Sequence, residues 1–194
     1  MTTQAGICLL MHEIEPMRPT NTGWLVADVV ADTAAFTWSR TEPDLRLLAL
    51  LRDPERAPYV VFPAEGADPR RVVTEVTAGP GRRPFFVLLD GTWSEAHKMF
   101  RKSAYLDGLP VLGLRAERTS RYRLRCTRGD AQLCTAEVAA LCLRLAGEEH
   151  AARALDAWLD VFIERTLDAR RTVPSDPASS ASRRLAAIVR SPAR

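Results

Sequence analysis

The chain has 194 residues, of which 46% are hydrophobic and 26% charged, and its formal net charge is only +3. This length and composition are typical of one globular domain with a sizeable core, and so small a net charge does not by itself indicate a nucleic-acid partner. The first residues lack a signal-peptide pattern and no stretch approaches the roughly 20 apolar residues of a membrane span, so we expect a cytoplasmic protein with no membrane partner.

Short apolar runs alternate with helical patterns along the chain. The expected strands are residues 6–11, 34–38, 59–62, 85–89, 111–114 and 122–124. The expected helices are residues 22–30, 44–51, 69–76, 93–103, 135–145 and 148–168. Strands that alternate with helices in this way predict an α/β fold built on a mostly parallel sheet flanked by helices.

The composition changes near the C-terminus. From residue 172 onward the chain is rich in Pro, Ser, Ala and Arg, which predicts a disordered tail with a helical turn near residues 183–189. We therefore expect one domain over residues 1–170 and a flexible tail over residues 171–194.

The cysteines and histidines do not have the spacing of a metal site. No pair of cysteines has C-x-x-C spacing, and the three histidines are far apart in the sequence, so we expect reduced, buried thiols and no bound metal. The four cysteines are Cys8, Cys126, Cys134 and Cys142.

The most informative segment is residues 85–102. Its five apolar residues, 85–89, end at Asp90, as in a buried parallel strand that is followed by a polar turn. Thr92 and Glu95 then have the spacing of a capping box, which predicts a helix start. Because open α/β sheets bind ligands at the carboxyl ends of their strands, Asp90 is the first candidate for a functional residue.

Several common catalytic motifs are absent from the sequence. It has no G-x-G-x-x-G, no P-loop and no G-x-S-x-G elbow, so dinucleotide-binding, P-loop and serine-hydrolase functions have no support. An aspartyl phosphotransferase needs a second acid two residues after its nucleophile, and that position is Thr92.

Five blocks of the sequence, over about residues 6–147, resemble the DTW-domain family. Residues 90–93 resemble its D-x-T-W signature, and the other blocks follow in the family's order. In chain order the blocks are His12-Glu13-Ile14-Glu15 with Arg18 and Asn21-Thr22-Gly23, Val61-Phe62-Pro63, Asp90-Gly91-Thr92-Trp93, Ser120 to Arg125, and Leu133-Cys134-Thr135-Ala136-Glu137.

The resemblance implies a fold and an activity. DTW proteins are similar to tRNA-uridine aminocarboxypropyltransferases, which belong with the SPOUT-like α/β proteins that carry a C-terminal knot. They transfer the 3-amino-3-carboxypropyl group of S-adenosylmethionine to N3 of a uridine in tRNA and release methylthioadenosine. Many members also carry an N-terminal cysteine cluster, and this sequence shows none.

The resemblance also implies a set of site residues. The predicted catalytic residue is Asp90, which either pairs with the ammonium group of the cofactor or removes the uracil N3 proton. The predicted cofactor-binding residues are Phe62, Pro63, Asp90, Gly91, Thr92, Trp93, Leu133, Cys134, Thr135 and Glu137.

Basic residues flank the loop that carries Asp90. Only two of the 27 basic residues are lysines, and both lie on the helix after Asp90. Helical and strand periodicity place each group of basic residues on one face, which predicts a track for the phosphates of tRNA. The predicted RNA-binding residues are Arg18, Lys98, Arg101, Lys102, Arg121, Arg123 and Arg125.

Other interpretations remain open at this stage. The chain could be an RNA methyltransferase that uses S-adenosylmethionine, or an RNA-binding module without catalytic activity. Asp90 could simply cap the helix, Trp93 could be a core residue, and His12 could be an ordinary buried histidine. Cys134 is expected to be a small core residue and not a nucleophile. The sequence leaves the tRNA, the uridine and the oligomeric state open.

Overall fold

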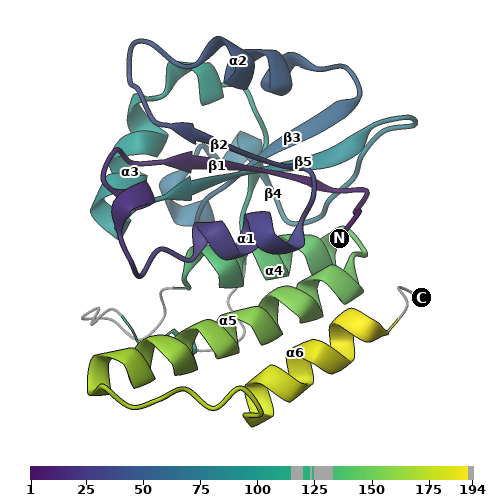
Figure 1. The fold of residues 1–194 in the computed structure, drawn as a ribbon. Helices are drawn as coiled ribbons and strands as arrows, with labels where there is room; N and C mark the ends of the chain where they lie inside the picture. Colours follow the sequence, from purple (N-terminus) through teal and green to yellow (C-terminus); the bar gives the residue numbers. More distant parts are fainter. Residues whose placement is uncertain (115–119, 123, 125–132, 192–194) are drawn as a thin grey trace.

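The fold is α/β, with a parallel sheet between two layers of helices (Figure 1). The computed structural model describes residues 1–114, 120–122, 124 and 133–191. In this part of the chain the sheet has six strands, all parallel, in the order β2-β1-β5-β3-β6-β4. The strands are β1 (Gly6–Met11), β2 (Thr33–Thr37), β3 (Arg56–Val61), β4 (Val72–Val73), β5 (Arg83–Asp90) and β6 (Val111–Leu112). The predicted α/β fold with a parallel sheet is confirmed.

Helices cover both faces of the sheet. Figure 1 shows α2 and α3 on one face and α1 and α4 on the other, with α5 and then α6 beyond them. The helices are α1 (Gly23–Val29), α2 (Leu45–Arg52), α3 (Trp93–Lys102), α4 (Thr135–Leu145), α5 (Glu149–Arg171) and α6 (Ser180–Arg190). Among the residues described, no helix is both long enough and apolar enough to cross a membrane.

Each strand contributes to two separate cores because successive side chains point to opposite faces. In β1, Ile7 and Leu9 pack on the side of α1, α4 and α5, whereas Cys8 and Leu10 pack on the side of α2 and α3. All four side chains are fully buried. The sheet is therefore apolar on both faces, which explains why its strands appear in the sequence as continuous apolar runs.

Two predicted elements are wrong. Residues 69–76 were expected to form a helix, but they form a short 3-10 turn, Pro69–Arg71, and then β4. Asp68 caps that turn by accepting a hydrogen bond from the Arg70 backbone N–H (3.0 Å), and the two β-branched valines, Val72–Val73, then pair with β6.

The second error concerns the strand expected at residues 122–124. Neither Tyr122 nor Leu124 lies in a strand, and residue 123 is outside the described part. The Tyr122 hydroxyl instead donates a hydrogen bond to the backbone carbonyl of Thr20. Contacts of this segment with a distant loop replace the expected strand pairing.

The C-terminal segment contains more helix than the sequence pattern predicted. The helical turn expected near residues 183–189 is confirmed as part of α6, which packs on α5. Ile188 is buried and Leu185 packs against the same core as α4 and α5. The division into a domain over residues 1–170 and a flexible tail stays a prediction.

The strand order creates a topological switch point at one place on the carboxyl edge of the sheet. The chain leaves β1 through α1 toward β2, and leaves β5 through α3 toward β6, so adjacent strands β1 and β5 are followed by connections on opposite faces that lead in opposite directions. Such a switch point opens a crevice at the carboxyl ends of the two strands. The fold thus singles out the ends of β1 and β5.

Candidate active site

Four polar or aromatic side chains follow neighbouring strands at the carboxyl edge of the sheet. Trp38 follows β2, His12 follows β1, Asp90 ends β5 and Phe62 follows β3. Because the strands lie in the order β2-β1-β5-β3, these four side chains lie side by side in the same order. His12 and Asp90 are the two at the switch point. Residues far apart in the chain therefore meet at one edge.

Asp90 is a buried carboxylate that is held on both oxygens. Only 3% of the residue is exposed. Its Oδ2 accepts a hydrogen bond from Asn21 Nδ2 (2.7 Å), and its Oδ1 accepts one from Thr135 Oγ1 (2.5 Å). These donors come from the segment before α1 and from the first residue of α4. Asp90 therefore joins two helix starts to the central strand, and the residue that caps α3 is Thr92.

The alternation of β5 explains why Asp90 faces α1 and α4. Phe86 and Leu88 belong to the core on that side, and Asp90 continues the same face. The approach of α1 is so close that a Cβ added to Gly23 would lie 2.8 Å from Asp90 Oδ2. The N-termini of α1 and α4 both lie near this carboxylate, and their dipoles favour its negative charge.

A chain of polar contacts runs from Asp90 across the edge to the other face. Asn21 Nδ2 also donates to Glu15 Oε2 (3.1 Å), and Glu15, which is fully buried, pairs with Arg18 (2.8 Å). Arg18 in turn lies 3.8 Å from Glu95 Oε1 on α3. The loop between β1 and α1 thus connects the carboxylate of β5 to the first turn of α3.

The capping box of α3 is confirmed, and it fixes Glu95. Glu95 Oε2 accepts hydrogen bonds from the backbone N–H and the hydroxyl of Thr92, both at 2.7 Å. Its other oxygen, Oε1, lies 3.4 Å from His12 Nδ1. Burial raises the pKa of Glu95, but the hydrogen bonds from Thr92 and the charges of His12 and Arg18 outweigh it and hold the pKa below its ordinary value.

Aromatic rings form a stack beside the start of α3, on the face of the sheet opposite to the Asp90 carboxylate. Phe62 lies parallel to Phe100 (4.1 Å between ring centroids) and to Trp93 (6.2 Å), and His97 meets Phe62 and Trp93 edge-on. Phe62 is buried, whereas Trp93 is 47% exposed. Trp93 is therefore not a core residue: it is supported from below and open to solvent, as an aromatic platform for a flat ligand would be.

The start of α4 is tied to the segment around residue 120. Glu137 accepts hydrogen bonds from the Cys134 backbone N–H (2.9 Å), the Ser120 hydroxyl (2.7 Å) and the Arg121 backbone N–H (2.7 Å). Burial, followed by the nearby Glu137 charge, raises the pKa of Cys134 to about 12. A thiol in this state is not a nucleophile at neutral pH. Leu133, directly before this start, is half-buried.

Of the three arginines predicted to share one strand face, the structure describes Arg121. The guanidinium of Arg121 pairs with Asp156 (2.6 Å) and Asp160 (3.2 Å) on α5, which favours a structural role. Arg123 and Arg125 lie outside the residues that the structure describes.

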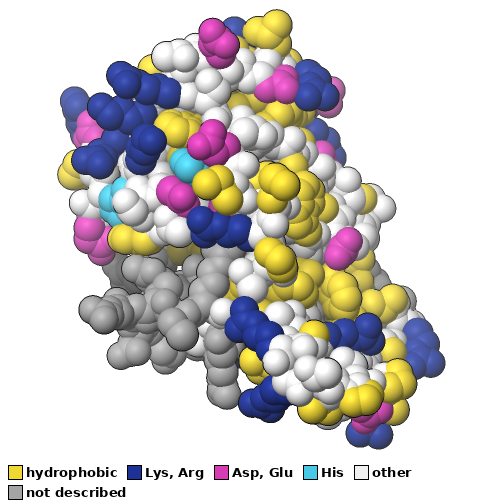
Figure 2. All heavy atoms as spheres, turned by 60° about the vertical axis from the view of Figure 1, so that its left-hand side comes forward, with side chains coloured by type: hydrophobic (Ala, Val, Ile, Leu, Met, Phe, Trp, Pro, Cys, Tyr) yellow, Lys and Arg dark blue, Asp and Glu magenta, His cyan; other side chains and the backbone are white. Residues whose placement is uncertain are grey.

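The basic residues of α3, in contrast, are open to solvent. Lys98, Arg101 and Lys102 are exposed, and no carboxylate of the described part lies within ion-pair distance of them. Lys98 Nζ lies 5.5 Å from the ring centroid of Trp38. Figure 2 shows Lys and Arg side chains gathered on this side of the molecule, beside two His side chains. The amphipathic pattern of α3 is thus as predicted from the sequence.

The structure brings the predicted cofactor residues to one edge but divides them between the two faces of the sheet. Asp90 and Thr135 meet on the α4 side and Phe62 and Trp93 on the α3 side, with Gly91 between them. Asn21 and Glu15 were not among the predicted site residues, although both lie in the polar run that follows the first apolar strand. Their position after this strand could have identified them as site residues, because polar residues that follow buried parallel strands gather at the carboxyl edge of the sheet.

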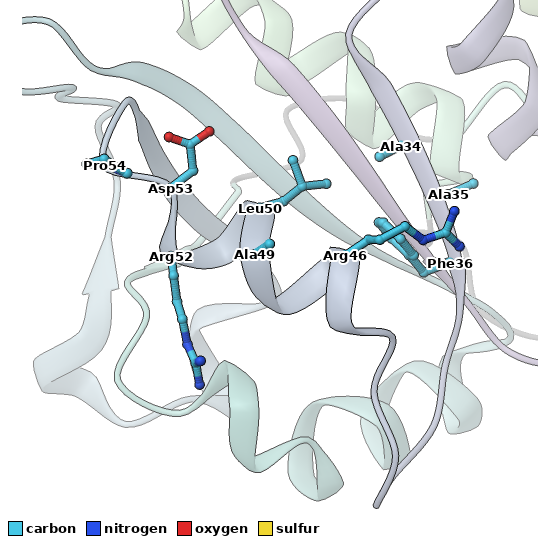
Figure 3. A pocket seen from close by; sticks show the side chains of 9 residues that line it. All are labelled: Ala34, Ala35, Phe36, Arg46, Ala49, Leu50, Arg52, Asp53 and Pro54. Carbon is cyan, nitrogen blue, oxygen red and sulfur yellow. The ribbon is translucent and has the colours of Figure 1, made fainter.

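A shallow hollow of about 750 Å³ lies elsewhere, between β2 and α2 (Figure 3). Its lining is largely apolar, and its Arg46 is already paired with Asp44 (2.7 Å). It lies along the strand and helix, not at the strand ends, so it is a weaker candidate than the edge at Asp90. Within the described residues, no group of three or more His, Cys, Asp or Glu side chains could hold a metal ion.

The chain matches one known family. The profile of the family described as DTW domain matches residues 1–167. This range contains the Asp90 edge, the basic face of α3 and most of α5. No solved structure matches the chain.

Proposed function

The chain belongs to the DTW-domain family, and from this premise we propose that it is a tRNA-uridine aminocarboxypropyltransferase. The family is consistent with tRNA modification. The specific reaction that we propose is transfer of the 3-amino-3-carboxypropyl group of S-adenosylmethionine to N3 of a uridine in tRNA, with release of methylthioadenosine.

The observation that carries this proposal is the pairing of a fixed buried carboxylate with an exposed aromatic platform at one switch point. S-adenosylmethionine has an ammonium group at one end and a flat adenine at the other. Asp90, held by Asn21 and Thr135, suits the ammonium group, and Trp93, supported by Phe62, suits the adenine. The SPOUT-like class and a C-terminal knot are part of the same proposal and rest on the family resemblance.

Positioning is the main task of such a site. The sulfonium has three electrophilic carbons, and the product depends on which one is presented to the nucleophile. Of the two roles considered for Asp90, the geometry favours the ammonium ligand, because both carboxylate oxygens already accept hydrogen bonds that stabilise the ionised form. An anion fixed in this way would hold the amino-acid end of the substrate and bring its γ-carbon to the uridine.

The exposed basic face of α3 supports a tRNA substrate. Lys98, Arg101 and Lys102 follow Trp93 on the same short helix, so phosphates bound there would place RNA beside the platform. Arg18 pairs with Glu15 and lies at the edge itself, so it is better placed to shape the site than to bind a distant phosphate.

Product analysis tests the proposed reaction. The purified protein is incubated with S-adenosylmethionine and unmodified tRNA, and the small products and the RNA nucleosides are identified by mass spectrometry. We expect methylthioadenosine and a uridine that carries the aminocarboxypropyl group. S-adenosylhomocysteine would identify a methyltransferase instead, and binding of both substrates without any product would identify a catalytically silent RNA-binding protein.

A further inference from the structure

The proposed reaction releases one proton. Uracil N3 forms a bond to the γ-carbon of S-adenosylmethionine, the bond from that carbon to sulfur breaks with its electron pair going to sulfur, and the N3 proton must leave. A positioned base accelerates such a step. Asp90 is poorly suited to this task because Asn21 and Thr135 already stabilise its ionised form.

His12 lies next to Asp90 but on the opposite face of the sheet. It directly follows β1, whose last residue pairs with Asp90, and its backbone N–H donates to the Asp90 carbonyl (2.8 Å). The ring stacks on Trp38 with 6.0 Å between centroids and 21° between planes. A Cβ added to Gly91 would lie 3.5 Å from the Cβ of His12, so the turn after β5 passes directly over this histidine.

The two ring nitrogens of His12 have different surroundings. Nδ1 is buried, and Glu95 Oε1 lies 3.4 Å from it. The side chain is 12% exposed, and Nε2, which has no partner in the described structure and is not among the buried unpaired atoms, is the nitrogen that solvent reaches. A proton on Nδ1, directed at Glu95, leaves the lone pair on Nε2 at the accessible edge.

The capping box explains why Glu95 is available for this contact. Thr92 supplies two hydrogen bonds to Oε2, so the carboxylate is fixed with Oε1 turned toward His12. The contact is longer than a good hydrogen bond, and catalytic hydrogen bonds often shorten only when substrate binds. A carboxylate that orients an imidazole in this way is the arrangement of catalytic acid–base pairs on many folds.

Charged groups face this pair from each element packed around it. Glu95 comes from α3, Arg18 from the loop after β1 with its Nη2 3.8 Å from the same Glu95 oxygen, and Lys98 lies 5.5 Å from the centre of the Trp38 ring on which His12 stacks. The surroundings of the imidazole therefore include one anion and two cations.

We propose that His12 is the catalytic base that takes the N3 proton of the uridine on Nε2, and that Glu95 is the positioning residue that holds the proton on Nδ1. This assignment rests on the function proposed above and adds a base to it. It also gives the loop after β1 two tasks: the loop supplies His12 on the face of α3, and it supplies Asn21, which holds the Asp90 carboxylate of β5 on the other face.

The test is the pH dependence of methylthioadenosine formation in a single turnover with substrate tRNA. We compare wild type with His12→Gln and Glu95→Gln, and with His150→Gln on α5 as a matched control. His12→Gln should slow the step about 100- to 10,000-fold with S-adenosylmethionine and tRNA affinities retained. The wild-type rate should fall when acidification protonates the base, and this fall should be absent in the variant.

Two further measurements keep the proposal testable if a variant is poorly folded. Added imidazole should restore part of the rate of His12→Ala. Nitrogen NMR of the wild-type protein in mildly basic buffer should show a proton on Nδ1 of His12 and none on Nε2. Glu95→Gln keeps the cap but should weaken this tautomer preference and slow the step less than His12→Gln does.

The outcomes separate this proposal from the one on which it rests. A wild-type protein that releases no methylthioadenosine with any tRNA overturns the proposed function and the base assignment with it. An active wild type with a His12→Gln rate within about threefold and an unchanged pH profile overturns the base assignment alone. An NMR spectrum that shows the proton on Nε2 of His12 and none on Nδ1 would also overturn the base assignment alone.

Discussion

The carboxyl edge around Asp90 and the outer face of α3 differ in how their polar groups are used. At the edge, Asp90, Asn21 and Glu15 are almost fully buried, and each takes part in hydrogen bonds or ion pairs with the others. On the outer face of α3, Lys98 and Lys102 project into solvent with no acidic partner in the described part of the chain.

This difference supports our proposal that the edge performs the chemistry and the face of α3 attracts the RNA. A buried polar network can bind a substrate in one orientation only when the positions of its groups are fixed. A fixed anion can therefore orient a small charged substrate. Exposed cations without partners contribute little to folding but add to the attraction of a polyanion. The two regions lie at opposite ends of one short helix, so a bound RNA could reach both.

The largest effect is expected from Asp90→Asn. The variant keeps the shape of the side chain but removes the charge that we assign to the ammonium group, so turnover should fall by about 100- to 1000-fold, with tRNA affinity unchanged. The measurement is methylthioadenosine formation, with Asp107→Asn on the exposed loop after α3 as the matched control. Near-normal turnover in a folded Asp90→Asn protein would mean that the edge network is only structural.

The sequence predicts the parts of this site whose contacts join residues close together in the chain, and it does not predict contacts between distant residues. The end of the buried strand at Asp90 and the capping box of Thr92 and Glu95 are local, so residue pattern alone identified them. The contacts of Asp90 with Asn21 and Thr135 join residues 69 and 45 positions apart. No local pattern contains them, because they depend on which face of the sheet each helix covers.

The misassigned segment at residues 69–76 has the same cause. Two adjacent valines, Val72 and Val73, are compatible with either a helix or a buried strand. Their pairing with β6, almost forty residues later in the chain, decides between the two. Likewise no local pattern revealed that Asp156 and Asp160 of α5 hold the guanidinium of Arg121, because these contacts join distant parts of the chain.

The second prediction concerns the α3 face. Reversing two charges with Lys98→Glu and Lys102→Glu should weaken tRNA binding at least about tenfold and flatten the dependence of log affinity on log salt by roughly 0.7 to 0.9 for each phosphate that the helix no longer binds. The affinity for S-adenosylmethionine should stay the same. The measurement is a salt series of tRNA binding isotherms.

The control for this pair reverses two arginines on another exposed helix. Arg183→Glu with Arg190→Glu on α6 changes the net charge by the same amount away from the site. If both double variants lose tRNA affinity equally, the α3 face is not a specific track and only the total charge matters.

The third prediction separates paired from unpaired basic residues. Arg121→Ala removes a partly exposed guanidinium that bridges to α5, so the free energy of unfolding should fall by about 0.5 to 1 kcal/mol while tRNA affinity changes little. Denaturant unfolding and tRNA binding are measured on the same preparation. A loss of tRNA affinity with unchanged stability would restore Arg121 to the RNA-binding set.

The smallest expected effect is the pH dependence of stability from Glu95. Its pKa in the folded state is lower than its ordinary value of 4.5, so its contribution to stability is present above that pH and is lost as the pH falls through the folded pKa. Glu95→Gln should therefore show a smaller drop in melting temperature between neutral and acidic pH than wild type. Glu42→Gln, on an exposed loop, serves as the control and should behave like wild type.

The most direct test of the account is an experimental structure of the protein with S-adenosylmethionine bound. We predict that the ammonium group lies within hydrogen-bond distance of Asp90, that the adenine stacks on Trp93, and that the sulfonium lies at the ends of β1 and β5, between Asp90 and His12. S-adenosylmethionine bound in the hollow between β2 and α2, or bound at the edge without contact to Asp90, would contradict the account.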